Sequence, residues 1–135
     1  MRFVDTNILL YAISSRPEEA SKAERAVSLL GQRDLALSVQ VLQEFYVQAT
    51  RPTSDIRIEH ERAIAFIRTL RRYPVQEISL DLLEMALDHK HRWQISYWDA
   101  AILAAARQLG CGILLTEDLQ HGQDFEGVIV ENPFL

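Results

Sequence analysis

The sequence has a single cysteine, Cys111, among 135 residues, so it can form neither an internal disulfide nor a zinc cluster built from cysteines. Its longest uninterrupted apolar run covers only residues 100–106, whereas a membrane-spanning helix needs about 20 residues. Asp5 interrupts the apolar stretch that follows Arg2, so we expect no signal peptide. These absences predict a cytoplasmic protein without a membrane segment.

Two common catalytic motifs are also missing. No G-x-S-x-G sequence is present to support a hydrolase triad. The glycines at 110 and 112 precede a predicted strand, whereas a glycine-rich phosphate loop would follow one. His89 and His91 are two residues apart on a predicted helix, so they face different directions and cannot chelate one metal ion.

Acidic residues outnumber basic residues by 19 to 14, which gives a net charge of −5 and, taken alone, argues against a nucleic-acid partner. The distribution is uneven, however. Residues 51–72 carry six arginines and three acidic residues, whereas residues 117–135 carry five acidic residues and no Lys or Arg. This separation predicts an anion-attracting and a cation-attracting region within one domain, although a solvated amphipathic helix accounts for the arginines equally well.

Short apolar stretches alternate with amphipathic stretches along the chain. Strands are predicted at residues 2–5, 35–37, 113–116 and 128–130, with an extended segment at 75–78. Helices are predicted at residues 15–31, 38–51, 79–92 and 96–110, and an arginine-bearing helix follows Pro52. Ser15, Ser79 and Ser96 are the expected caps. This alternation favours one α/β domain over residues 1–135, a three-layer α/β/α fold with a mainly parallel sheet.

Four acidic residues are predicted to meet at one edge of this sheet. Asp5 ends the first strand, and Glu44 lies early in the helix after the second strand. Asp99 is in the first turn of its helix, and Asp118 follows the strand at 113–116 by two residues. Ligands of open α/β sheets bind beyond the carboxyl ends of the strands. Carboxylates gathered there repel one another without a cation, and oxygen ligands suit Mg²⁺ or Mn²⁺, which points to phosphoryl chemistry.

Each acid also has an ordinary explanation when taken alone. Asp99 follows Ser96 by three residues, as in a capping box. Asp118 suits a turn, and Glu44 suits a solvated helix face. Asp5 is the least well explained, because turn chemistry does not account for an acid that ends an amino-terminal apolar strand. Convergence of all four therefore favours a site, and their mutual repulsion predicts a raised pKa for at least one of them.

Four motifs, in this order, resemble the signature of PIN domains: Phe3-Val4-Asp5-Thr6-Asn7, Gln43-Glu44-Phe45, Tyr97-Trp98-Asp99-Ala100-Ala101-Ile102 and Leu115-Thr116-Glu117-Asp118. The chain length and the ending Glu126-Gly127-Val128 with Asn132-Pro133-Phe134 are similar to single-domain VapC-type toxins. The resemblance covers the chain from Asp5 to Phe134. It implies an endoribonuclease in which Asp5, Glu44, Asp99 and Asp118 hold Mg²⁺ or Mn²⁺ and act on RNA. It also implies inhibition by a small antitoxin protein, and we expect a homodimer.

The resemblance further implies that some residues orient the carboxylates or water, namely Thr6, Asn7 and Thr116. It leaves Asp124 as an outer ligand and Glu117 as an alternative to Asp118. In the arginine-rich stretch, we expect Arg68, Arg71 and Arg72 to guide the RNA backbone. The aromatic residues Trp93, Tyr97 and Trp98 suit base stacking, but packing in a core or an interface is the commoner role.

Two other functions stay open. A Mg²⁺-dependent phosphatase with an aspartyl nucleophile also begins with an acid at the end of the first strand. It usually carries Asp-x-Asp there, whereas this chain has Asp5-Thr6-Asn7. The third possibility is a catalytically silent module that binds a partner protein and no Mn²⁺.

Overall fold

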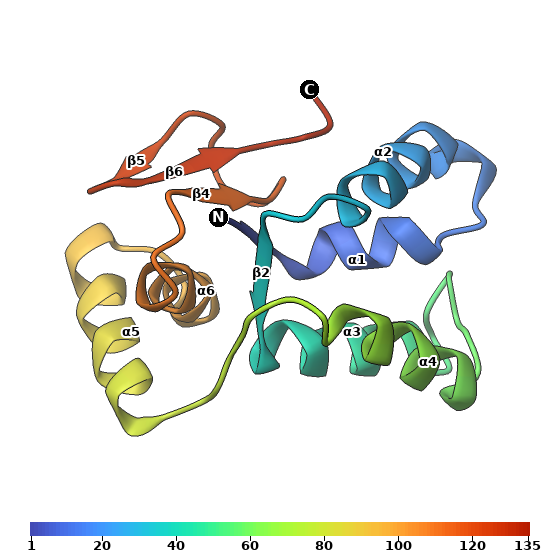
Figure 1. Ribbon diagram of the computed structural model, residues 1–135, viewed down its shortest axis with the longest axis horizontal. Coiled ribbons are helices and arrows are strands. Elements are labelled where there is room, and N and C mark those ends of the chain that lie inside the picture. The colour runs from blue at the N-terminus through green and yellow to red at the C-terminus, as the bar shows by residue number, and fades with distance from the viewer.

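The computed structural model describes residues 1–135 and contains one six-stranded sheet with the strand order β3-β2-β1-β4-β6-β5 (Figure 1). All neighbouring strands are parallel except β5 and β6, which are antiparallel. The strands are β1 (Arg2–Val4), β2 (Leu35–Ser38), β3 (Val75–Gln76), β4 (Ile113–Leu115), β5 (Asp124–Phe125) and β6 (Val128–Glu131). The mainly parallel sheet is the one predicted from the sequence, apart from the short strand β5.

Helices cover both faces of this sheet and complete a three-layer α/β/α domain. The helices are α1 (Thr6–Ile13), α2 (Ala20–Leu30), α3 (Val39–Thr50), α4 (His60–Leu70), α5 (Leu80–Trp93) and α6 (Tyr97–Gln108). The pair α5 and α6 lies on one side of β2, and α1 and α2 lie on the other side (Figure 1). No helix is both long enough and apolar enough to cross a membrane.

Serine caps set the starts of three helices. The hydroxyl of Ser38 accepts a hydrogen bond from the Val41 N–H (3.3 Å) at the start of α3. Ser79 and Ser96 accept equivalent bonds at the starts of α5 and α6, each at 3.1 Å. A side-chain oxygen at this position satisfies an N–H group that has no partner within the helix. The predicted starts of these helices are therefore confirmed.

The sequence did not predict α1. Asp5 ends the strand and also caps this helix, because its Oδ1 atom accepts a hydrogen bond from the Thr6 N–H (2.7 Å). The chain thus passes from β1 into α1 without a loop. The helix predicted to start at Ser15 begins instead with a 3₁₀ turn at Pro17–Glu19 and continues as α2, and no side chain caps that turn. The proposed Ser15 cap was therefore wrong.

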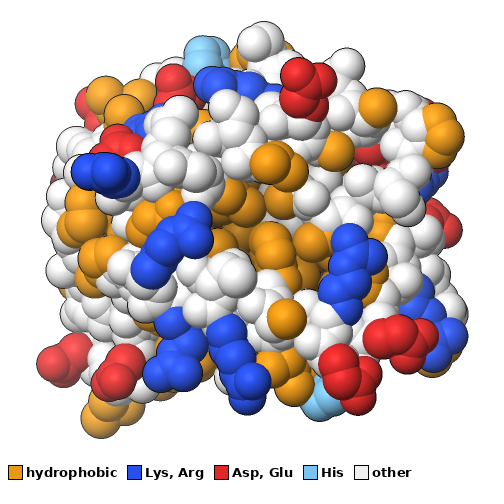
Figure 2. Space-filling view, turned by 45° about the vertical axis from the view of Figure 1, so that its right-hand side comes forward, with side chains coloured by type: hydrophobic (Ala, Val, Ile, Leu, Met, Phe, Trp, Pro, Cys, Tyr) orange, Lys and Arg blue, Asp and Glu red, His pale blue; other side chains and the backbone are white.

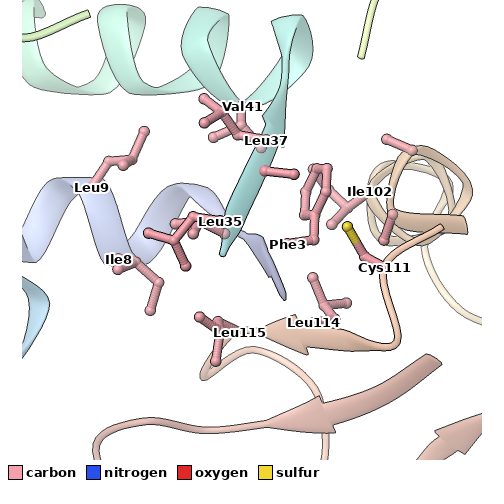
Figure 3. Packing of buried hydrophobic residues seen from close by; sticks show 14 of the residues in the cluster. Phe3, Ile8, Leu9, Leu35, Leu37, Val41, Ile102, Cys111, Leu114 and Leu115 are labelled. Atoms are coloured by element: carbon pink, nitrogen blue, oxygen red, sulfur yellow. The ribbon is translucent and has the colours of Figure 1, made fainter. Parts of the chain in front are cut away.

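The core lies between the sheet and the helices that pack on it. Figure 3 shows Phe3 of β1 beside Leu114 of β4, with Ile102 of α6 and Cys111 packed against them. Residues 100–106 of α6 are all buried, because this helix lies between the sheet and α5. Each fully buried Leu, Ile or Phe side chain contributes about 1.5–3 kcal/mol to the free energy of unfolding. This packing holds the strands, and thus the carboxyl edge of the sheet, in place.

Candidate active site

The strand order reverses at β1, where the chain has β2 and β3 on one side and β4 and β6 on the other. Asp5 directly follows β1, and its N–H donates to the Leu115 carbonyl at the end of β4 (3.1 Å). In open α/β sheets, ligands bind beyond the carboxyl ends of the strands at such a reversal. The fold thus provides a crevice next to Asp5.

A cavity of about 210 Å³ occupies this crevice, and all four predicted acids line it. They come from separate parts of the chain: the end of β1, the middle of α3, the first turn of α6 and the segment after β4. The lining residues are Asp5, Thr6, Asn7, Leu10, Glu44, Gln48, Trp98, Asp99, Ile102 and Asp118. The structure therefore brings together residues that are up to 113 positions apart in the sequence.

Asp5 forms the buried floor of this cavity, with only 6% of its surface exposed. Its Oδ1 atom accepts from the Thr6 N–H, and its Oδ2 atom accepts from the Thr116 hydroxyl (2.8 Å). Burial raises the pKa of Asp5 to about 7, against the opposing effect of these hydrogen bonds. The carboxylate is thus held in a fixed orientation but is costly to ionise.

Two further acids have defined environments. The Oε2 atom of Glu44 accepts from the Thr6 hydroxyl, and its Oε1 atom accepts from the Gln40 amide, each at 2.8 Å. Asp99 is partly buried, and burial raises its pKa. The sequence predicted a raised pKa for at least one acid and gave repulsion between the acids as its main cause, which was wrong. Burial is the largest cause for both Asp5 and Asp99, and the charges of Asp118 and Glu44 add less.

Thr116, directly after β4, joins several of these groups through one hydroxyl. Its Oγ1 atom donates to Asp5 and accepts from the Asn7 amide and from the Asp118 N–H, both at 3.1 Å. The Asn7 amide also donates to Asp118 Oδ2 (3.1 Å). Thr6, Asn7 and Thr116 therefore contact the acids that they were expected to orient.

The two alternative acids lie elsewhere. Glu117 accepts hydrogen bonds from Lys22 Nζ (2.9 Å) and from the Tyr11 hydroxyl, and it does not line the acid cavity. The Asp124 carboxylate accepts from the Gly127 N–H (2.7 Å) within the turn that joins β5 and β6. Among the three candidates at this end of the chain, only Asp118 lines the cavity.

None of the three arginines expected to guide RNA lines the acid cavity. Arg72 donates to the Leu30 carbonyl (2.8 Å) and lies over the Tyr73 ring, so it also ties α2 to the segment after α4. Two other arginines are closer to the acids. Arg16 and Arg51 line a neighbouring cavity of about 290 Å³, which shares Asn7, Leu10 and Gln48 with the acid cavity. Arg16 lies outside the arginine-rich stretch, so charge counting did not single it out.

The chemistry of the acid cavity fits a hard cation. All four acids present oxygen donors, and the Asn7 Oδ1 atom is buried without a hydrogen-bond partner. His89 is buried and His91 is exposed, as the helix spacing predicted, so these two side chains do not form a site. No three His, Cys, Asp or Glu side chains are arranged to enclose a metal ion as they stand. At least one of the four carboxylates would therefore have to move to complete a cation site.

The PIN domain family matches residues 2–123, and the chain belongs to this family. Solved structures with the same fold include a toxin–antitoxin complex from Klebsiella pneumoniae, with 22% identity, a TM-score of 0.72 and 98% of each chain covered. The sarcin–ricin loop cleaving toxin VapC20 of Mycobacterium tuberculosis has 23% identity and a TM-score of 0.68, with 87% of this chain and 92% of that chain covered.

A third similar structure is VapBC2 from Rickettsia felis bound to a DNA fragment from its promoter. It has 20% identity and a TM-score of 0.67, and 97% of each chain is covered. At these identities the likeness shows the fold alone. Among curated proteins, none matches the sequence.

Proposed function

We propose that this protein is a Mg²⁺- or Mn²⁺-dependent endoribonuclease and the toxin of a toxin–antitoxin pair. One observation carries the proposal: Asp5, Glu44, Asp99 and Asp118 converge on one cavity at the reversal point of the sheet. Membership of the PIN domain family and the toxin–antitoxin complexes among the similar structures support it.

The residues of the cavity have distinct parts in this mechanism. A bound divalent cation supplies a Lewis acid that lowers the pKa of water and shields the charge of a phosphodiester. Hydrogen bonds from Thr6, Gln40 and Thr116 orient the carboxylates of Asp5 and Glu44, which would hold the cation from these two sides. Because the pKa of Asp5 is about 7, part of the population carries a proton on this carboxyl group near neutral pH, and Asp5 would have to lose that proton to bind a cation. No side chain has to become a covalent nucleophile.

The geometry favours this function over an aspartyl phosphatase. Each oxygen of Asp5 accepts one hydrogen bond, from Thr6 or from Thr116, which orients the carboxylate and leaves a lone pair on each oxygen for a cation. The residue two positions later is the amide Asn7, whose side chain donates to Thr116 and Asp118. These contacts suit a group that supports metal-binding acids.

Asp5→Asn and Asp99→Asn test the proposed function directly. Each substitution removes a negative charge but keeps the side-chain shape, so we expect RNA cleavage in Mn²⁺ to fall by more than about 100-fold, the upper range for losing a supporting partner. EDTA should abolish wild-type cleavage. The matched control is Asp124→Asn, which alters a carboxylate in the β5–β6 turn and should cleave at the wild-type rate.

Cleavage at the wild-type rate by the Asp5→Asn, Asp99→Asn double variant would show that the site is assigned wrongly. An aspartyl-phosphate trapped at Asp5 would instead establish the phosphatase. A wild-type protein that binds no Mn²⁺ and cuts no RNA would support the silent module.

For the antitoxin, we propose an apolar contact on the side of the molecule that carries α1 to α4. Figure 2 shows hydrophobic side chains gathered in a shallow central area of this side, with Lys and Arg side chains around it. An apolar groove of about 510 Å³ lies along α3 and α4 and is lined by Val39, Leu42, Gln43, Tyr46, Val47 and Ile67. Such a groove suits the apolar face of a partner helix.

For the homodimer, we propose a second surface, next to the acid cavity. Ile78, Leu80, Leu83 and Trp98 are exposed by 59%, 73%, 39% and 64%. They line one cavity of about 420 Å³ between α3, α5 and α6. Exposed apolar side chains gathered in this way are typical of protein interfaces, which supports the proposal. Analytical ultracentrifugation is expected to give twice the mass of one chain.

A further inference from the structure

Gln40 is a buried polar residue next to the acid cavity that neither composition nor motif singled out. It lies in the first turn of α3, four positions before Glu44, so the two side chains share one face of the helix. Only 8% of its surface is exposed. Its Nε2 atom donates to Glu44 Oε1 (2.8 Å) and to the Trp98 carbonyl (3.4 Å). A buried amide with these partners connects two elements of the site.

The first of these contacts fixes a carboxylate. Glu44 accepts from Thr6 on one oxygen and from Gln40 on the other, so neither oxygen can rotate away without losing a hydrogen bond. The donor is also neutral. It therefore orients the Glu44 carboxylate without adding a further charge to a cavity in which four carboxylates already meet.

The second contact reaches the helix that carries another acid. Trp98 immediately precedes Asp99 in the first turn of α6, and its carbonyl accepts from the same Gln40 amide group that holds Glu44. One side chain therefore links the acid on α3 to the start of α6. The link runs from Glu44 to the residue next to Asp99.

We propose that Gln40 is a positioning residue of the carboxylate site, which sets the affinity for a divalent cation by holding Glu44 against the start of α6. The inference rests on the proposed function, because it assumes that Glu44 and Asp99 bind the cation. Gln40 acts through Glu44 and the helix start, and it does not line the acid cavity itself. Partners that orient metal ligands typically change metal affinity by 10- to 100-fold when removed.

Gln40→Met tests this role, because methionine keeps the length of the side chain but has no N–H donor. In the full-length protein, we expect the Kd for Mn²⁺, followed by electron paramagnetic resonance of the free ion, to rise by about 10- to 100-fold. RNA cleavage should fall at low Mn²⁺ and recover at high Mn²⁺, with KM for RNA unchanged. The matched control is Gln108→Met, an exposed glutamine at the carboxyl end of α6 that lines none of the four cavities described above, which should leave the Kd unchanged.

A Glu44→Gln background separates positioning from packing. If Gln40 acts through Glu44, Gln40→Met should add little further loss of Mn²⁺ affinity there. An unchanged Kd in Gln40→Met, or an equal loss in both backgrounds, overturns the proposal. Should Gln40→Met fail to fold, Gln40→Ala in the same two backgrounds gives the same outcomes. A wild-type protein that binds no Mn²⁺ overturns the proposed function as well, whereas normal wild-type binding and cleavage with an unaffected Gln40→Met overturns the positioning role alone.

Discussion

At the scale of single residues, the Thr116 hydroxyl makes three hydrogen bonds within the site. A hydroxyl can donate one hydrogen bond and accept two, and Thr116 does both, since it donates to Asp5 and accepts from Asn7 and Asp118. Its side chain is completely buried. Each of its three partners would lose a hydrogen bond if the hydroxyl were removed.

Thr116→Val and Thr116→Ser form a matched pair that isolates the hydroxyl. Valine has nearly the shape of threonine but no oxygen, so we expect the free energy of unfolding to fall by about 1–3 kcal/mol for a buried partner left unpaired. Mn²⁺ affinity should fall by about 10- to 100-fold. Serine keeps the hydroxyl and should bind Mn²⁺ as the wild type does, although loss of the buried methyl group should lower the free energy of unfolding by about 0.8 kcal/mol.

Urea unfolding and Mn²⁺ titration measure the two effects of these Thr116 variants. If Val and Ser weakened Mn²⁺ binding equally, a general disturbance of the buried site would be responsible, and the hydroxyl would have no special part.

The acids of the site could be found from the sequence, but some of their partners could not. Asp5 and Asp118 follow predicted strands and Glu44 lies in the helix after another, so their convergence followed from the topology of a parallel sheet. Gln40 is different. A glutamine four positions before a glutamate is common on solvated helices, and its burial depends on how α3 packs against α6.

At the scale of secondary structure elements, the predictable helices were those with a local start signal. Ser38, Ser79 and Ser96 each cap the helix that was expected there. By contrast, α1 has eight residues, and its consecutive apolar side chains give no helical periodicity. Its cap is Asp5, which the sequence presents first as a strand end. Because Asp5 both follows β1 and caps α1, the sequence pattern indicated the strand and not the helix.

The arginines of α4 and of the loop after α3 give a prediction about RNA. Each contact with a single-strand phosphate adds about 0.7 to the slope of log affinity against log salt. We expect Arg51→Ala, beside the acid cavity, to reduce this slope by about 0.7, and the Arg68→Ala, Arg71→Ala variant to reduce it by up to about 1.4. Arg72 is left intact because it donates to the Leu30 carbonyl.

Fluorescence anisotropy with a catalytically inactive Asp5→Asn background measures this salt dependence without cleavage. Arg33→Ala, an exposed arginine that lines neither cavity, is the control. An unchanged slope in the Arg68, Arg71 variant would exclude α4 from the RNA path and leave it along Arg16 and Arg51.

At the scale of the whole molecule, the fold buries an ionisable group, the Asp5 carboxyl, next to the apolar core. The buried strands below the cavity hold Asp5 where water is largely excluded, and this burial raises its pKa. Glu44, Asp99 and Asp118 surround the same cavity. Without a cation, the native state therefore carries an ionisation penalty that the unfolded chain does not have.

This penalty has a definite pH dependence. The folded pKa of Asp5 is about 7, above its ordinary value of 3.8, so the folded state binds more protons than the unfolded state between these values. The free energy of unfolding of the metal-free protein should therefore decrease as the pH rises from about 4 to about 7, by at most about 1.4 kcal/mol per pH unit, and then level off. The raised pKa of Asp99 acts in the same direction.

Melting curves of the wild type and of Asp5→Asn, in EDTA and in Mn²⁺ at about pH 5.5 and about pH 7.5, measure this penalty and the effect of the cation. In EDTA at the higher pH, Asp5→Asn should melt above the wild type, because it has no charge to bury. Saturating Mn²⁺ should stabilise the wild type by about 2.7 kcal/mol at 100 times its Kd and should stabilise the variant much less. Comparison with the variant at each pH cancels other titrating groups, such as His89. A wild type that is insensitive to Mn²⁺, together with an Asp5→Asn variant that is less stable in EDTA, would mean that the Asp5 charge is already compensated within the protein and that the carboxylates do not share a cation.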